Sequence, residues 1–114
     1  MYKKLIIVFL GIMLLPVSGL YAHPPGKVVL SYDQDSQALT VEVVHRVSNP
    51  GRHFVNRIEV LRNGEMVVDG APSRQDETTM RDVYTLSDVQ PGDVLQAIAF
   101  CNMGGKRSGK IQIA

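Results

Sequence analysis

Hydrophobic and polar residues alternate with a period of two along most of the chain from residue 27 onward. The clearest run is ALTVEVVHRV, residues 38–47. Such alternation is typical of a β-strand with one buried face. The face expected to be buried carries Leu39, Val41, Val43 and His45. The pattern therefore predicts a histidine at the end of a core-facing row.

Six further segments have the length and composition of strands, and turn residues separate them. The Asn63-Gly64 pair is typical of a two-residue hairpin, and SNPGR and VQPGD supply proline and glycine for longer turns. No segment after residue 22 shows the periodicity of an amphipathic helix. The expected strands are residues 27–32, 53–61, 66–70, 80–88, 94–101 and 109–114. About seven short strands with turns between them predict an antiparallel β-sandwich of immunoglobulin-like type.

Residues 1–22 follow a different pattern. Two lysines precede an apolar run over residues 5–15, and the segment PVSGLYA ends in the small residue Ala22. This is the pattern of a secretory signal peptide, and the apolar run is too short for a comfortable membrane span. We expect cleavage after Ala22, with Gly19 as the alternative. The mature protein, residues 23–114, is then one domain without a membrane anchor, located in a bacterial periplasm or secreted.

The mature chain has ten basic and eleven acidic residues, a balance that argues against nucleic-acid binding. Its single cysteine, Cys101, excludes an intrachain disulfide. In an exported protein an odd cysteine indicates an intermolecular bridge or a thiol held by a metal. The three histidines are His23, His45 and His53. Taken singly, each of these four residues also has an ordinary reading, as a solvated or core side chain.

Two stretches, VVHRVSNPGRHFVNRIEV and AFCNMGG, together resemble the iron-binding domain of the superoxide reductases, the desulfoferrodoxin and neelaredoxin family. That family has a histidine at the end of a strand, a short proline-containing loop, and a second histidine followed by an aromatic and an aliphatic residue. Near its C-terminus it has Cys-Asn-x-His-Gly. His45 and His53 match the two histidines, and Cys101 matches the cysteine. His23, in HPP, corresponds to the family's N-terminal ligand histidine.

The resemblance implies a mononuclear non-haem iron with imidazoles in its equatorial plane and the Cys101 thiolate as axial ligand. It also implies reduction of superoxide to hydrogen peroxide, with superoxide or another small anion bound at an open sixth position. Imidazole and thiolate both suit iron, and the thiolate donates electron density to the metal. A metal-bound thiolate is already deprotonated and occupied, so Cys101 needs no disulfide partner. The sequence identifies no electron donor.

Two features of the family are missing. Gly104 stands where the family motif has its histidine, and the lysine that attracts superoxide in the family would fall within the expected signal peptide. These differences bear on reductase activity more than on metal binding. Cleavage after Ala22 would give His23 a free α-amine beside its imidazole, and the two groups together can chelate one metal. One hypothesis is that this amine replaces the missing imidazole.

Two alternatives stay open. An N-terminal histidine and a second histidine on a β-sandwich are similar to the copper-binding brace of periplasmic copper-handling proteins, and copper favours imidazole, amine and thiolate ligands. On that reading the protein binds or delivers copper without turnover. The other alternative is a sandwich without a metal, which binds a protein through its exposed strand edges.

Overall fold

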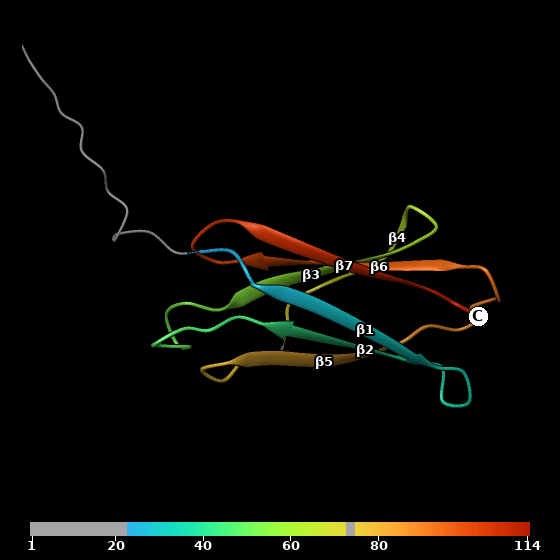
Figure 1. Cartoon of the computed structure of the whole chain (residues 1–114), viewed down its shortest axis with the longest axis horizontal. Helices are drawn as coiled ribbons and strands as arrows, with labels where there is room; N and C mark the ends of the chain where they lie inside the picture. The colour runs from blue at the N-terminus through green and yellow to red at the C-terminus, as the bar shows by residue number, and fades with distance from the viewer. Residues whose placement is uncertain (1–22, 73–74) are drawn as a thin grey trace, which may run out of the picture.

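The computed structural model of the protein describes residues 23–72 and 75–114, and the expected signal peptide lies outside the described residues. Within them the chain forms seven strands and no helix, arranged as two antiparallel sheets packed against each other (Figure 1). The expected antiparallel β-sandwich is confirmed. The strands are β1 (Lys27–Asp33), β2 (Ala38–Val44), β3 (Val55–Arg62), β4 (Glu65–Gly70), β5 (Thr79–Thr85), β6 (Val94–Cys101) and β7 (Lys106–Gln112).

One sheet has the strand order β1-β2-β5, and the other has the order β4-β3-β6-β7. Strands β1 and β7, at the edges of the two sheets, lie beside each other and close one side of the sandwich. Among the described residues no helix is long and apolar enough to cross a membrane.

The core lies between the sheets and is made by the inward-facing side chains of both. Every second residue is buried along the central part of β2 and along the whole of β6, as the period-two pattern predicts. These two strands belong to opposite sheets, and both end at the same end of the sandwich (Figure 1). The residues that form the core are Val28, Leu30, Leu39, Val41, Val43, Val55, Ile58, Val60, Met80, Leu86, Leu95, Ala97, Ala99 and Ile113.

The Asn63-Gly64 hairpin is confirmed between β3 and β4. Both residues have a positive φ, 52° for Asn63 and 86° for Gly64. Two successive residues with positive φ are typical of the tight turn whose twist matches that of the flanking strands. The register of the two strands on either side of this turn is thereby fixed locally.

Six of the seven strands differ from the expected boundaries by one to three residues, and two of these differences follow from backbone pairing. The last strand begins at Lys106 rather than Gly109, because its backbone pairs with β6 from Phe100 onward although the segment KRSG is polar. The strand β2 ends at Val44, but the His45 N–H still donates to the Thr78 carbonyl at 2.8 Å. The start of β7 and the backbone hydrogen bond beyond the end of β2 both depend on a neighbouring segment, and the hydrophobic pattern does not encode such pairing.

The contact between β7 and β1 gives a stability prediction. A Cβ on Gly109 would lie 2.1 Å from the Val28 carbonyl oxygen, so Gly109→Ala has to push the two edge strands apart. We expect the variant to lose about 1–3 kcal/mol of unfolding free energy, measured by urea denaturation. The control is Gly70→Ala, where an added Cβ meets nothing within 4 Å and the change should stay within about 0.5 kcal/mol. Equal unfolding midpoints for the two variants would contradict the prediction.

Candidate metal centre

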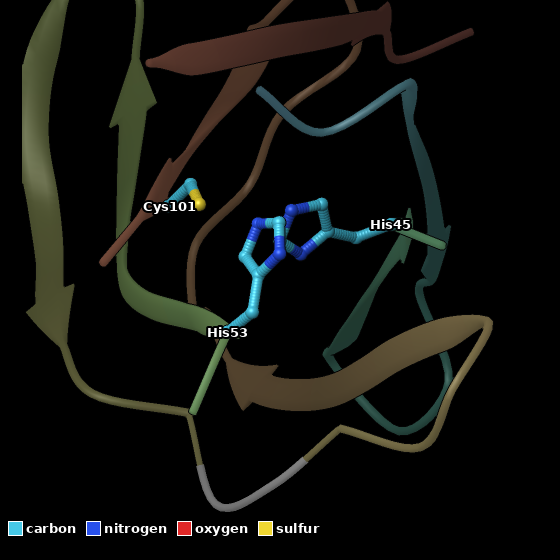
Figure 2. A group of neighbouring side chains, drawn as sticks. All are labelled: His45, His53 and Cys101. Atoms are coloured by element: carbon cyan, nitrogen blue, oxygen red, sulfur yellow. The ribbon is translucent and has the colours of Figure 1, made fainter. Parts of the chain in front are cut away.

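His45, His53 and Cys101 meet at one end of the sandwich. His45 directly follows β2, Cys101 is the last residue of β6, and His53 lies two residues before β3. The β3–β6 register sets Val55 opposite Cys101, which brings the chain around His53 to the cysteine. Figure 2 shows the two imidazole rings turned toward each other and the thiol pointing toward them. The cluster therefore joins both sheets.

Each of these three side chains offers one ligand atom, and the three atoms lie within 4.8 Å of one another. The centroids of the His45 and His53 rings are 4.6 Å apart. His45 is 0 % exposed, Cys101 is buried, and His53 is half-buried. A group of two imidazoles and one thiol with these separations could hold a metal ion.

The Nε2 atoms of His45 and His53 are both buried and have no hydrogen-bond partner among the residues that the structure describes. Buried polar atoms are nearly always paired, because an unpaired one has lost its water without compensation. Two such atoms on adjacent rings beside a thiol are available to bind a cation, and nitrogen and sulfur donors of this kind suit a transition metal.

His23 lies next to this cluster. Its ring centroid is 5.4 Å from that of His45 and 5.2 Å from that of His53. The side chain is exposed, and its Nδ1 lies 3.0 Å from the Pro24 carbonyl oxygen. The three-residue ligand group does not include it in this conformation. All four residues singled out in the sequence are thus neighbours, with His23 at the open side.

The segment that follows His23 is tied down at three points. Pro25 is fully buried, the Arg107 Nε donates to its carbonyl at 3.1 Å, and the Gly26 N–H donates to the Val44 carbonyl at 2.8 Å. Pro24 rests on Gly105, where an added Cβ would lie 2.9 Å from the Pro24 Cβ. Because Gly105 in the β6–β7 turn has no Cβ, the N-terminal segment can approach the cluster of His45, His53 and Cys101.

The loop before β3 is shaped by Asn49. Its side-chain oxygen accepts from the Gly51 N–H at 3.0 Å, and its carbonyl accepts from the N–H groups of Arg52 and His53 at 3.0 and 2.9 Å. An asparagine that bonds to the backbone two residues ahead is a typical turn former, and Pro50 fixes one dihedral angle there. The SNPGR cluster thus turns the chain so that His53 faces the core end.

Asn102 joins this loop to the cysteine. Its Oδ1 accepts from the Phe54 N–H at 2.9 Å, and its Nδ2 donates to the Arg52 carbonyl at 2.9 Å. The residue thereby holds the segments of His53 and Cys101 together from both sides. The Met103 N–H, 3.4 Å from the Cys101 sulfur, donates to it. A hydrogen bond of this kind stabilises negative charge on the sulfur, which a metal-bound thiolate carries.

Sequence reasoning missed one residue of the site and left the role of another unassigned. Asn102 belonged to the quoted motif, but its two backbone hydrogen bonds cannot be read from it. Gln75 lies in a polar loop between β4 and β5, and its side chain contacts His45. No local pattern identifies this glutamine, because its hydrogen-bond partners lie at least twenty positions away in the sequence.

The electrostatics of the cluster favour neutral imidazole at His53. Burial lowers the pKa of His53, the proximity of His45 and His23 lowers it further, and a hydrogen bond to the His23 backbone opposes these effects. A neutral imidazole offers the lone pair that a metal needs. Near neutral pH, a metal binding at this site would therefore meet little competition from protons for the His53 imidazole.

Comparisons with models of known protein families and with curated proteins find no match for this chain. A relationship to the superoxide reductases accordingly stays a prediction that rests on the residues quoted above. The geometry of the cluster is independent of that relationship.

The lowered pKa of His53 predicts a pH dependence of stability. The folded protein binds this proton less readily than the unfolded chain, so the stability of the metal-free protein is full above about pH 6.5 and falls as the pH drops through the folded value. A single proton gives a slope of at most about 1.4 kcal/mol per pH unit. In His53→Asn this slope should diminish in the pH unit below about 6.5, which lies above the titration of ordinary carboxyl groups. Parallel curves for the two proteins in urea denaturation would contradict the prediction.

Proposed function

We propose that this protein binds one transition-metal ion through His45, His53 and Cys101, with His23 as a further ligand. The observation that carries the proposal is the pair of buried, unpaired Nε2 atoms beside a thiol, brought together from the two sheets. Structural histidines in a sandwich core would be expected to find hydrogen-bond partners. The metal would be held at the end of an otherwise apolar core. The low dielectric constant of such a core strengthens the electrostatic attraction between the ion and each ligand.

The metal we propose is iron, and the activity is reduction of superoxide to hydrogen peroxide in an exported protein. Three considerations support this choice: the resemblance of the two quoted stretches to the superoxide reductases, the imidazole and thiolate donors, and the Met103 N–H that donates to the sulfur. Bound iron would supply the one electron that superoxide reduction needs, solvent would supply the two protons, and an external electron donor would return the iron to its reduced state. The side chains of His45, His53 and Cys101 would hold the ion, and a small anion such as superoxide would be its substrate.

His23 and its α-amine would complete the ligand set after signal cleavage. Gly104, which stands at the family's histidine position, has a φ of 115°, a conformation that favours glycine over other residues. An imidazole at that position would be strained, so the fourth nitrogen has to come from another segment. The α-amine of His23 is the source we propose, since the ring of the same residue lies within 5.4 Å of both other rings.

Copper binding without turnover is the second candidate. It is favoured by the same position of His23, because an N-terminal amine and imidazole form a chelate that copper binds strongly. The two candidates use the same residues and differ in the metal and in activity toward superoxide. Metal analysis can therefore separate them.

The first test is elemental analysis and visible absorption of the protein purified from its export compartment. We expect about one equivalent of iron and a thiolate-to-iron band that disappears in Cys101→Ala, since only the sulfur gives this transition. The control is Met66→Leu, at a side chain 48 % exposed on β4, which should keep both metal and band. One equivalent of copper would overturn the iron assignment in favour of the copper module. A wild-type protein without metal, which also fails to bind added Fe²⁺ or Cu²⁺, would overturn metal binding altogether.

The second test concerns the α-amine of His23. We expect mass spectrometry to find a mature N-terminus at His23, and insertion of one glycine before His23 to weaken metal binding by at least about tenfold, because the amine moves away from the ring. Insertion of one glycine after Asp35, in the exposed β1–β2 turn, is the control and should leave affinity unchanged. A mature N-terminus at Leu20, or equal affinity with and without the inserted residue, would exclude the amine as a ligand.

A further inference from the structure

Gln75 makes three hydrogen bonds at the metal centre with a single side-chain amide. Its Nε2 donates to the His45 carbonyl at 2.8 Å, and its Oε1 accepts from the Val55 N–H at 3.0 Å. The same oxygen lies 3.1 Å from the Nδ1 of His45. The residue itself is held in place by a bridge to Met80 at the start of β5. Its amide is therefore part of the wall of the cluster.

The two backbone contacts fix the orientation of this amide. A backbone carbonyl can only accept and a backbone N–H can only donate, so the amide nitrogen must face His45 and the oxygen must face Val55. An exchange of the two amide atoms, the usual ambiguity of glutamine side chains, would break both bonds. The atom that faces the His45 ring is consequently an oxygen, which accepts hydrogen bonds only.

An acceptor at this position determines where the His45 ring carries its proton. The Nδ1 must be the protonated nitrogen, since it donates to the Gln75 Oε1. In the neutral ring the lone pair then lies on Nε2, the buried atom that has no hydrogen-bond partner within the described part of the chain. A metal ligand whose other nitrogen is held by an oxygen acceptor is fixed in both rotation and tautomer.

The same amide also sets the distance between two segments of the site. It bonds to the backbone of His45 after β2 and to the backbone of Val55 at the start of β3, two residues beyond His53. A β-bulge lies at this point, where the β3–β6 register shifts between Val55 and Arg57. Bulges bend a strand locally, so a side chain that holds the Val55 N–H steadies the approach to His53.

We infer that Gln75 is a positioning residue, which holds His45 in the Nδ1–H tautomer and directs its Nε2 lone pair to the metal. The second half of this inference rests on the metal binding proposed above. The first half concerns the metal-free protein and stands independently of any metal. The role needs an oxygen acceptor at position 75, which glutamate also supplies and leucine does not.

Long-range ¹H–¹⁵N NMR of the metal-free protein tests the tautomer at about pH 8, above the ordinary range of histidine titration. We expect His45 to be protonated at Nδ1 in the wild type and in Gln75→Glu, and to populate the Nε2–H form in Gln75→Leu. The matched control is Gln90→Leu in the loop before β6, which should leave the His45 signals unchanged. An Nε2–H ring in the wild type would overturn the inference, and so would an unchanged ring in a folded Gln75→Leu. If that variant does not fold, the wild type and Gln75→Glu still decide, because Nε2–H in either contradicts the role.

Titration of the same proteins with Co²⁺ or Zn²⁺ tests the second half. Gln75→Leu should bind the metal about 10–100-fold more weakly than the wild type. Gln75→Glu should bind it at least as tightly as the wild type. Equal affinity of the wild type and Gln75→Leu would overturn the positioning role. A wild type that shows the Nδ1–H ring but binds none of Co²⁺, Zn²⁺, Fe²⁺ and Cu²⁺ would overturn the proposed function and leave the tautomer assignment standing.

Discussion

The period-two alternation of strand side chains is the constraint on which this site depends. Along β2 and β6 every inward position is filled by an apolar residue until the strand reaches the end of the sandwich, where the next inward positions are His45 and Cys101. Because the two strands belong to facing sheets, their last inward side chains have to meet across the core. A shift of either strand by one residue would turn its candidate ligand away from the core and bring residues of the other face, such as Glu42 of β2 or Gln96 of β6, into it.

Apolar packing brings the ligands together but does not orient them, and polar side chains from the loops supply that orientation. Gln75 bonds to the ring and backbone of His45, and Asn102 bonds to the backbone on either side of His53. Each amide uses both its donor and its acceptor on groups from distant parts of the chain. These two amides therefore hold the Nε2 atoms of His45 and His53 in place, as a preorganised ligand set requires. Both amides have their own hydrogen-bond partners, whereas the two Nε2 atoms have none among the described residues.

The sequence predicts what local patterns encode and misses what distant contacts decide. The row that ends in His45, the Asn63-Gly64 hairpin and the two-sheet architecture follow from alternation and turn chemistry, which act over a few residues. The start of β7 depends on pairing with β6, so its polar first residues gave no signal. Gln75 was equally invisible, because nothing in a polar loop indicates which amide will bond to a histidine thirty positions away.

The N-terminal segment is where the packing of the chain would be coupled to the proposed metal binding. Pro24 packs on Gly105 and Pro25 is buried, so these two prolines are held against the sandwich. His23, the residue before them, is exposed. An exposed ring has little reason to stay beside two others unless a ligand interaction offsets the loss of side-chain entropy, about 1 kcal/mol for a side chain of this kind. Metal binding would supply that interaction, and by linkage would stabilise the packing of the segment on the β6–β7 turn. The β6–β7 turn also carries the Met103 N–H that donates to the Cys101 sulfur. The same turn therefore contacts Cys101 through Met103 and the segment after His23 through Gly105.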